Sequence, residues 1–179
     1  MSSEKTKLEL AQQRIAELEK QLSQLIVSTP AVGAVIFNKN RQILVGIKNG
    51  AGQLVQGSVD PEDMGDTQRA LYREIYEEVG LRKDQLMLVG NAYEQVVYPL
   101  KDVGRYPNAT HRALMWSCLC VKDANVVLSP DAREFDGGVQ WMSVDEFLAG
   151  CAEHKKDMYV YVLSIFSHAI SGPRLQAGG

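Results

Sequence analysis

The chain has 179 residues, of which 45% are hydrophobic and 23% are charged, with a formal net charge of -3 at pH 7. This length suits one domain of ordinary size with an appendage, and the hydrophobic content is enough to bury a core. The acidic balance argues against broad, nonspecific nucleic-acid binding, because such binding needs a basic surface that displaces counterions. A polyanionic substrate must therefore be bound locally.

The sequence also argues against a secreted or membrane-spanning protein. The N-terminus lacks an apolar signal core, and no apolar run approaches the roughly 20 residues that a membrane span needs. The cysteines are odd in number, and Cys118 and Cys120 alternate within an apolar strand, with Cys151 elsewhere. This pattern favours small core residues over a disulfide or a zinc site. We expect a cytoplasmic protein.

Residues 6–27 read as an amphipathic helix with a seven-residue apolar repeat. One seam position holds Leu8, Ile15 and Leu22, and the other holds Ala11, Leu18 and Leu25. Three heptads are only marginally stable alone. The helix either forms a coiled coil in a homodimer, which we favour, or folds back on its own domain. We assign residues 1–28 to this helix.

The next segments predict one α/β domain over residues 29–173, followed by a tail over 174–179. Thr29-Pro30 ends the first helix, and two buried strands joined by a turn at 38–41 follow. Further strands are expected at 86–98, 112–122 and 138–142, with a short helix from Asp145 and a C-terminal helix over about 155–170. This order predicts a sheet covered on both faces by helices.

A helix is predicted between Asp66 and Gly80. Asp66 or Thr67 can cap its start, and Gly80 stands where a left-handed residue would end it. Apolar residues spaced by four form a stripe that can pack on the sheet: Leu71, Ile75 and Val79.

Three acids lie on another face of the same helix. Glu74, Glu77 and Glu78 stand at i, i+3 and i+4. Acids that face one way repel each other unless a cation lies among them, and oxygen ligands without His or Cys favour Mg²⁺, with Mn²⁺ as the alternative. The other interpretation is a solvated acidic surface.

Residues 73–81 read R-E-I-Y-E-E-V-G-L, which fits the pattern R-E-U-x-E-E-x-G-U with U an aliphatic residue. This is the more specific half of the Nudix box, so the chain resembles the Nudix hydrolases, whose fold is an α/β/α sandwich with a mixed sheet. In that family the three glutamates, here Glu74, Glu77 and Glu78, bind divalent cations. The arginine, here Arg73, orients them, and an upstream glycine, here Gly57, contributes a backbone carbonyl.

The upstream half of the box departs from the family pattern. Fifteen residues separate Gly57 from Arg73, two more than in the family. We place the insertion in the segment 61–64 and expect Asp66 to stand for the acid of the family's glycine-glutamate pair.

Matches outside the box resemble the branch that contains dinucleoside polyphosphate hydrolases and RNA 5′-pyrophosphohydrolases. They are residues 53–57, the pair 98–99, the run 134–137 and the pair 156–157 ahead of a terminal helix. The resemblance implies that Glu134 supplies a further carboxylate, which binds metal or accepts the proton of the attacking water. Candidates to hold the phosphate chain are Lys48, Gln56, Tyr98, Lys101 and Arg105.

The expected function is metal-dependent hydrolysis of a phosphoanhydride bond. Its catalytic residues would be Arg73, Glu77, Glu78 and Glu134. Diadenosine tetraphosphate is the first choice of substrate, the 5′-triphosphate end of RNA the second and a diphosphoinositol phosphate the third. The alternative is a catalytically silent scaffold, because fold alone does not fix function.

Overall fold

The computed structural model describes residues 14–15, 28–92, 96–99, 111–123, 125–131 and 133–172, with backbone only at 98 and 99. The predicted N-terminal helix lies outside the described residues except for Arg14 and Ile15, and so does the predicted tail. The homodimer and the domain boundaries therefore stay predictions.

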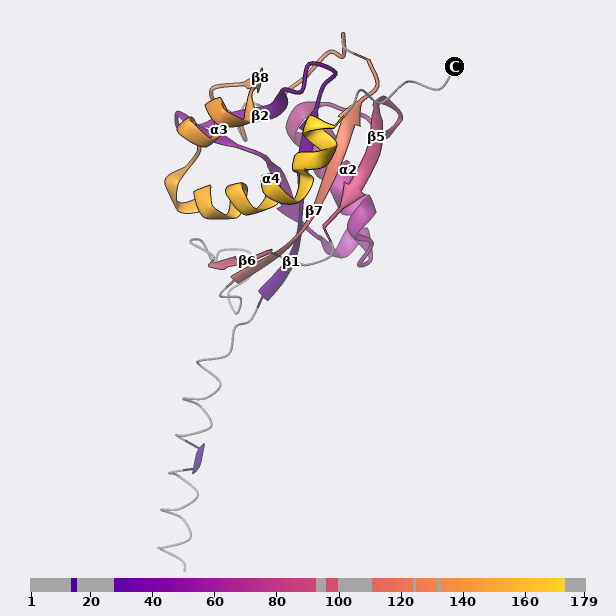
Figure 1. Cartoon of the computed structure of the whole chain (residues 1–179). Coiled ribbons are helices and arrows are strands. Elements are labelled where there is room, and N and C mark those ends of the chain that lie inside the picture. The colour runs from indigo at the N-terminus through magenta and orange to yellow at the C-terminus, as the bar shows by residue number, and fades with distance from the viewer. Residues whose placement is uncertain are drawn as a thin grey trace, which may run out of the picture.

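The described residues form an eight-stranded mixed sheet whose main path runs in the order β3-β2-β1-β7-β5. Off this path, β4 pairs with β1, β6 with β7 and β8 with β2. The strands are β1 Ser28–Phe37, β2 Ile43–Lys48, β3 Ala51–Gln53, β4 Val55–Ser58, β5 Leu86–Asn91, β6 Val96–Pro99, β7 His111–Val121 and β8 Val139–Met142. Figure 1 shows β1 and β7 side by side through the middle of the domain.

β1 is the central strand and is buried along nearly its whole length. It runs parallel to β7, from the pair Ser28 and His111 to the pair Phe37 and Cys120. On its other side β1 meets β2 only at Phe37 and Ile43, because β4 pairs with the first half of β1 instead. The two predicted strands and their turn are confirmed. After the turn, however, β2 separates from β1, and β4 takes its place beside β1. The other edge of β4 is therefore available to side chains from outside the sheet.

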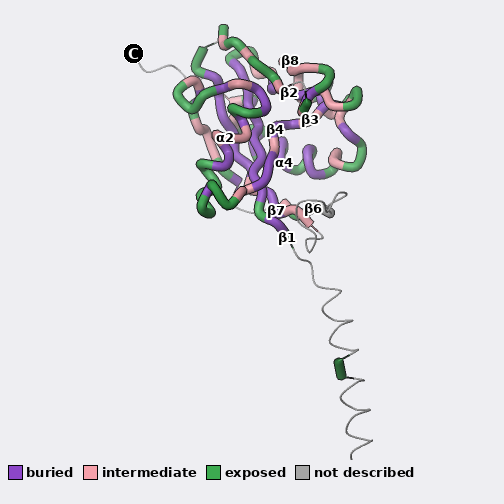
Figure 2. The backbone as a smooth tube through the Cα atoms, turned by 180° about the vertical axis from the view of Figure 1, so that it is seen from behind, coloured by how far each residue is buried: buried purple, intermediate pink, exposed green. Residues whose placement is uncertain are grey.

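Helices cover both faces of this sheet, which confirms the predicted fold class (Figure 1). The helix α2, Thr67–Val79, packs on one face, where Ile36, Ile75 and Val79 are among the buried residues. The helices α3, Val144–Gly150, and α4, Lys156–Ser171, lie on the other face, where Trp116 and Tyr159 belong to the core. Figure 2 shows the buried stretch of β1 between these two layers. In the described part of the chain, no helix is long and apolar enough to cross a membrane.

The ends of α2 agree with the sequence prediction. The side chain of Asp66 accepts hydrogen bonds from the backbone N–H groups of Gln68 and Arg69, as an N-cap does. Gly80 follows the helix at a φ of 76°, a left-handed conformation that a glycine adopts without steric cost. These caps fix where α2 begins and ends, and so fix the position of its glutamates.

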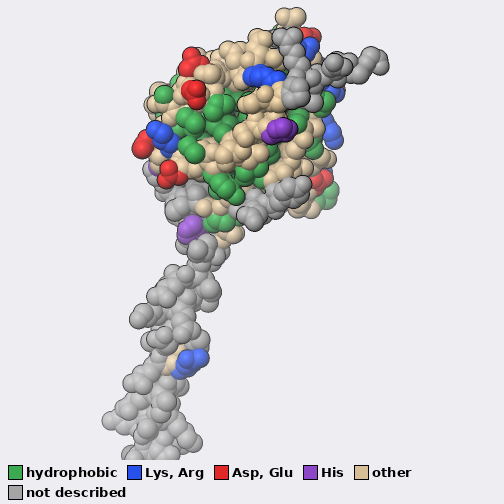
Figure 3. Space-filling view, in the orientation of Figure 1, with side chains coloured by type: hydrophobic (Ala, Val, Ile, Leu, Met, Phe, Trp, Pro, Cys, Tyr) green, Lys and Arg blue, Asp and Glu red, His purple; other side chains and the backbone are tan. Residues whose placement is uncertain are grey.

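Arg41 connects the turn between β1 and β2 to the end of α4. Its guanidinium donates hydrogen bonds to the backbone carbonyls of Ile170 and Gly172. Carbonyls at the end of a helix lack partners within the helix, and a cation there also opposes the helix dipole. The outer side of α4 carries partly exposed apolar residues, and Figure 3 shows such side chains gathered on this face. They are Val160, Tyr161 and Ile165.

Candidate active site

The three glutamates of α2 differ in exposure although they share one side of the helix. The side chain of Glu77 is 56% exposed and that of Glu74 is 13% exposed, whereas Glu78 is 7% exposed. The difference arises because Glu78 lies nearest to the stripe of Leu71, Ile75 and Val79, which packs on the sheet. The predicted acidic face therefore runs from solvent at Glu77 into the protein at Glu78.

The open edge of β4 holds the two inner glutamates. The backbone N–H of Gln56 donates to Oε2 of Glu78 at 3.3 Å. One residue further along, Gly57 lies against Glu74 so closely that a Cβ at this position would overlap the Glu74 carboxylate. Glycine is needed here for space, because its φ is not in the left-handed region. β4 thus brings Gly57 against the acidic cluster, and the carbonyl role that the resemblance implies stays a prediction.

Arg73 ties the loop after β4 to the glutamates. Its Nε and Nη2 donate to the two oxygens of Asp63 at 3.2 and 2.7 Å, and Nη2 also donates to the carbonyl of Ser58 at 2.9 Å. Its Nη1 donates to Glu74 at 2.8 Å and to Glu77 at 3.1 Å. The hydrogen bonds with Arg73 hold the pKa of Asp63 below its usual value, and Asp63 in turn raises the pKa of Arg73.

This geometry corrects the assignment of the acid in the loop. We expected Asp66 to stand for the family's glutamate, with the insertion at 61–64. In the structure Asp66 caps α2, whereas Asp63, 1% exposed, is the carboxylate that pairs with Arg73. The reason is local: Pro61–Asp63 forms the 3-10 helix η1, which turns the Asp63 side chain inward toward α2. The two extra residues thus lie between Asp63 and Arg73.

Glu134 reaches the site from the loop between β7 and β8. Its Oε1 accepts a hydrogen bond from Nζ of Lys48 on β2 at 2.7 Å. The loop is anchored nearby, since Phe135 is buried against Gly46, where a Cβ would meet its ring. Asp136 also accepts from the backbone N–H of Asn49. The structure therefore brings together Glu134 and Lys48, two residues that the sequence separates by 86 positions.

The electrostatics of the cluster fit a divalent cation. Burial, followed by the nearby carboxylates of Glu134 and Glu74, raises the pKa of Glu78 to about 9. Burial likewise raises the pKa of Glu74. Buried carboxylates that repel each other are stabilised when a cation lies among them, and oxygen ligands suit Mg²⁺ or Mn²⁺. Gly57, which has no Cβ, leaves room beside Glu74.

The carboxylates are arranged around cationic side chains in this structure. Within the described ranges, no three His, Cys, Asp or Glu side chains stand close enough together to hold a metal. Glu77 pairs with Arg73 and Glu134 with Lys48 instead. Glu77 and Glu134 are partly exposed and have flexible side chains. Rotation of these two side chains would bring their carboxylates to an ion bound beside Glu74 and Glu78.

A hollow of about 900 Å³ borders the exposed side of this cluster. It runs from Glu77 and Tyr76 past the 3-10 helix η2, Lys83–Gln85, to the loop that precedes β8. Charges of both signs line it, including Arg82, Lys122 and Asp131. The hollow gives access from solvent to the outer glutamate.

The predicted substrate-binding residues divide into three groups. Lys48 and Gln56 lie at the site, Lys48 through Glu134 and Gln56 through its backbone N–H. The backbone of Tyr98 belongs to β6 and pairs with Arg112 of β7, but its side chain is not described. Lys101 and Arg105 lie outside the described residues, so their role stays a prediction.

Four polar residues near the site did not come from sequence reasoning. Asp63 was hidden by the altered spacing of the loop, although five residues separate it from Gly57. Ser58, Arg112 and Lys155 lie on strands or turns far apart in the sequence and meet only through the sheet. The alternation of β7 could have marked Arg112, because it falls on the same face as Leu114 and Trp116, which are core residues.

Known proteins match this chain over most of its length. The chain matches the NUDIX domain family over residues 27–162. It is 31% identical to an RNA pyrophosphohydrolase of Wolbachia pipientis from Culex pipiens, over 80% of this chain and 91% of the relative. It is 28% identical to an RNA pyrophosphohydrolase of Photorhabdus laumondii, over 79% of this chain and 84% of the relative.

Solved structures share the fold at lower identity. A Caenorhabditis elegans Ap4A hydrolase in a binary complex is 17% identical, with a TM-score of 0.61, and the match covers 79% of this chain and 98% of that one. The Escherichia coli dihydroneopterin triphosphate pyrophosphohydrolase is 19% identical with a TM-score of 0.60, over 77% and 99% of the two chains. At these identities the likeness concerns the fold.

Proposed function

The chain belongs to the NUDIX domain family of pyrophosphohydrolases, and we propose that it hydrolyses a phosphoanhydride bond in a 5′-polyphosphate carried by a nucleoside. The first candidate substrate is the 5′-triphosphate end of RNA, and the second is diadenosine tetraphosphate (Ap4A). The observation that carries the proposal is the burial of Glu78 beside Glu74, with Glu134 close enough to raise its pKa. Buried carboxylates that lie close together destabilise the folded protein unless a cation binds among them.

A bound Mg²⁺ or Mn²⁺ would supply charge neutralisation at the phosphates and a more acidic water. Glu74, Glu77, Glu78 and the Gly57 carbonyl are the groups that would hold it. Arg73 fixes Glu74 and Glu77 and is itself fixed by Asp63. This second layer matters because a ligand that is free to turn binds less tightly than one held in place.

Glu134 is the group we assign to the attacking water. It lies close enough to Glu78 to raise the pKa of that residue, it is 41% exposed, and it pairs with Lys48. A carboxylate in that position can bind metal or accept the proton that water loses when it attacks phosphorus. A phosphate oxygen of the substrate would compete with Glu134 for the ammonium group of Lys48. Lys48 can therefore bind either the Glu134 carboxylate or the substrate.

The choice of RNA over Ap4A reverses the order that the sequence suggested. The curated relatives above are RNA pyrophosphohydrolases, and the match with them covers about four fifths of this chain. The likeness to an Ap4A hydrolase is one of fold, which keeps Ap4A as the second candidate. The acidic net charge fits either substrate, because only the 5′ phosphates need to be held.

The proposal is tested by replacing Glu77, Glu78 and Glu134 singly with Gln. Each variant keeps the shape of the side chain and removes its charge. We expect Glu77→Gln and Glu78→Gln to lower turnover by about a thousandfold or more, since a lost metal ligand forfeits several kcal/mol of transition-state stabilisation. Glu134→Gln should lower turnover with less effect on metal affinity. Melting temperatures should stay near that of the parent, because the changes relieve repulsion among carboxylates.

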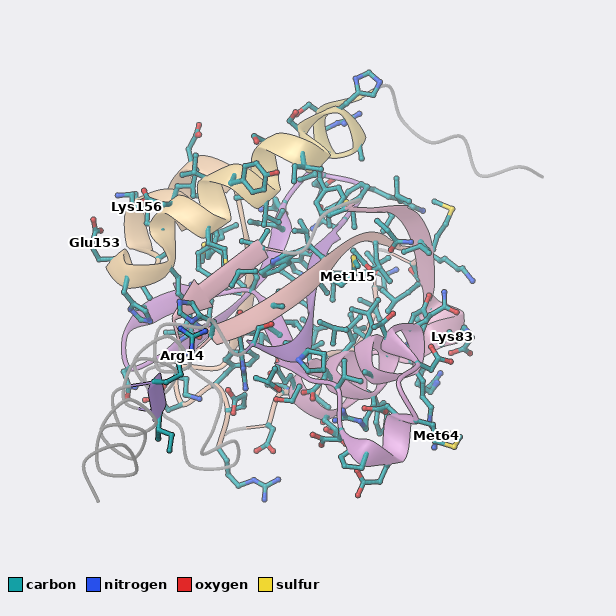
Figure 4. The ribbon with its side chains drawn as sticks, turned by 90° about the horizontal axis from the view of Figure 1, so that it is seen from below. Arg14, Met64, Lys83, Met115, Glu153 and Lys156 are labelled. Carbon is teal, nitrogen blue, oxygen red and sulfur yellow. The ribbon has the colours of Figure 1, made fainter. Side chains whose placement is uncertain are left out.

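Glu153→Gln is the matched control, since this glutamate is 88% exposed and lies on the opposite side of Figure 4 from Met64 and Lys83, which flank α2 in the sequence. It should behave like the parent in every assay. If Glu77→Gln and Glu78→Gln fold and turn over like the parent, the helix is not a catalytic one. The scaffold alternative is then the better account of the chain.

The substrate is decided by identifying products with Mg²⁺ and with Mn²⁺. Triphosphorylated RNA should give pyrophosphate and a 5′-monophosphate end, and Ap4A should give ATP and AMP. A higher kcat/KM on RNA supports the first candidate, whereas a higher value on Ap4A promotes the second. A diphosphoinositol phosphate belongs in the same panel as the third choice.

A further inference from the structure

A second polar cluster lies on the α4 side of the sheet, next to the strand that carries Gly57. Its members are Thr29 of β1, Ser58 of β4 and Arg112 of β7, and we call them the arginine pocket. Thr29 and Arg112 are paired in the parallel ladder, so their side chains leave the sheet on the same face. Nη2 of Arg112 donates to Oγ of Ser58 at 3.1 Å, which brings the third member to the same place.

The polar atoms of the arginine pocket are poorly satisfied. Nε of Arg112 and Oγ1 of Thr29 are both buried and have no hydrogen-bond partner among the described residues. Thr29 as a whole is 4% exposed. A buried donor without a partner is uncommon in folded proteins and calls for an explanation such as a ligand or an ordered water. Two such atoms on adjacent strands indicate a shared partner.

The described residues offer no counterion to the charges near the pocket either. In the described part of the chain, Arg112 has no carboxylate within ion-pair distance, and its hydrogen bond goes to a neutral hydroxyl. Lys155, at the start of α4, is likewise bonded to a neutral group, Oε1 of Gln53 at 3.0 Å. Burial, followed by the positive charges of Arg112 and Lys48, lowers the pKa of Lys155 to about 8, although Glu78 and Glu134 act in the opposite direction.

A purely structural role for Arg112 explains these facts poorly. A guanidinium that only tied β7 to β4 would need one acceptor, and a serine hydroxyl is a weak one for a charged group. Placing two cations near each other, both partly buried, is unfavourable unless an anion binds between them. Guanidinium, ammonium and hydroxyl groups are also the groups that proteins use to bind phosphate.

Ser58 links the arginine pocket to the acidic cluster. Its backbone carbonyl accepts from Arg73, which holds the glutamates, and its hydroxyl accepts from Arg112. The residue before it, Gly57, lies against Glu74. The pocket and the glutamates are thus the two sides of one short strand, so a phosphate chain bound at the glutamates can extend around the edge of β4 toward Arg112.

We propose that Arg112, with the hydroxyls of Ser58 and Thr29 and the ammonium of Lys155, binds the phosphate groups of the substrate that are not attacked. This inference rests on the proposed function. It assigns the phosphates that are not attacked to the arginine pocket, on the α4 side of the sheet. Arg112 is then a specificity residue: it favours substrates with three or more phosphates over those with two, because a shorter chain held at the glutamates does not reach it.

The test compares Arg112→Gln, Arg112→Lys and Thr29→Val with the parent as full chains. Binding of inorganic tripolyphosphate is measured by calorimetry at neutral pH in the presence of EDTA, so that no metal can bridge it to the protein. We expect Arg112→Gln to weaken binding by about tenfold to a hundredfold, which is the range for one charged hydrogen-bonding group. Arg112→Lys should recover part of the loss, and Thr29→Val should weaken binding a few fold.

Lys156→Gln is the control, because Lys156 is the neighbour of Lys155 but lies on the outer side of α4 in Figure 4 and pairs with Glu153. It should bind tripolyphosphate like the parent. In hydrolysis assays, Arg112→Gln should raise KM for a triphosphorylated RNA end with kcat changed much less, and should barely change KM for a diphosphorylated end. A merely structural role would not distinguish the two chain lengths.

Unchanged tripolyphosphate affinity in a folded Arg112→Gln variant overturns the proposal. If that variant does not fold, unchanged affinity in both Arg112→Lys and Thr29→Val overturns it equally. The result is independent of the hydrolase assignment: a parent protein that binds tripolyphosphate through Arg112 but hydrolyses nothing contradicts the proposed function alone. A protein that hydrolyses RNA ends with no contribution from Arg112 contradicts this inference alone.

Discussion

Arg73 contacts both carboxylate oxygens of Asp63, and Asp63 is among the most deeply buried polar residues of the described structure. The same carboxylate accepts the backbone N–H of Asp60 at 2.9 Å, so it also fixes the turn that precedes α2. Arg73 is 24% exposed and also forms ion pairs with Glu74 and Glu77. The loop after β4 and the acidic face of α2 are therefore held by one ion pair.

Replacing Asp63 with Asn should destabilise the protein strongly. The substitution removes the buried charge that Arg73 contacts most closely, although Arg73 keeps Glu74 and Glu77, and the loss of such a charged hydrogen bond costs about 1.5 to 3 kcal/mol. Chemical denaturation at neutral pH measures the loss. Asp84→Asn is the control, because Asp84 is 73% exposed in its pair with Arg82, and surface pairs contribute little. Equal effects of the two substitutions would contradict a structural role for Asp63.

The effect of Asp63 should depend on pH in one direction. Its pKa is below the ordinary value of 3.8 because Arg73 stabilises the charged form. An unfolded chain therefore takes up the proton more readily, and the stability that Asp63 contributes is present above pH 3.8 and lost as pH falls further. The difference between the parent and Asp63→Asn should shrink over that acidic range. A difference that grows on acidification would be the contrary result.

Gly57→Ala should disable the acidic cluster with a smaller effect on folding. The added methyl group would overlap the Glu74 carboxylate, which must then turn away from the position beside β4. We expect at least a tenfold loss in Mg²⁺ affinity or turnover, the size usually seen when a ligand is displaced. Gly150→Ala is the control, since a Cβ there meets open space. Parent-like Mg²⁺ affinity and turnover in Gly57→Ala would show that Glu74 does not need its place against the glycine.

Arg41→Gln should lower the stability of the domain by roughly 1 kcal/mol. The substitution removes a cation and its hydrogen bonds from the carbonyls at the end of α4. For a domain of this size, such a loss lowers the melting temperature by about 2 to 4 °C. Lys39→Gln, an exposed change in the same turn, should leave it unchanged. Catalysis at neutral pH should be unaffected in both, because α4 packs on the opposite face of the sheet from α2 and its glutamates.

The sequence predicts α2 and its glutamates well because the signals are local. The cap, the apolar stripe and the left-handed glycine all lie within the helix or one residue from it. Composition also finds β1, β2, β7 and β8, but it misses β3 and β4 and merges β5 and β6 into one strand over 86–98. The sequence does not predict which strands pair. β1 pairs with β7 and β4 and meets β2 at one position only, and no short-range pattern indicates that β4 lies beside β1.

The parts of the site that the sequence misses depend on long-range contacts. Asp63 is assigned only when η1 is seen to turn it toward Arg73. Arg112 and Lys155 look like ordinary surface cations in the sequence, and only the sheet places them beside Ser58 and Gln53. Motif matching finds the groups that share one helix, whereas the groups that recognise the rest of a substrate are collected from several strands.

The N-terminal segment should hold two chains together. Its seam residues repeat every seven positions, and Ile15, one of its two described residues, is 55% exposed in the single chain. An apolar seam of three heptads is unfavourable in water unless a second surface covers it. Light scattering should give twice the chain mass for residues 1–179 and the single mass for a chain that starts at Ser28.

Ile15→Lys should give the single mass, whereas Gln13→Lys, at an outer heptad position, should leave the dimer intact. If the full chain and the shortened chain both have the single mass, the helix folds back on its own domain, and the exposed side of α4 with Val160, Tyr161 and Ile165 is the apolar surface to examine next.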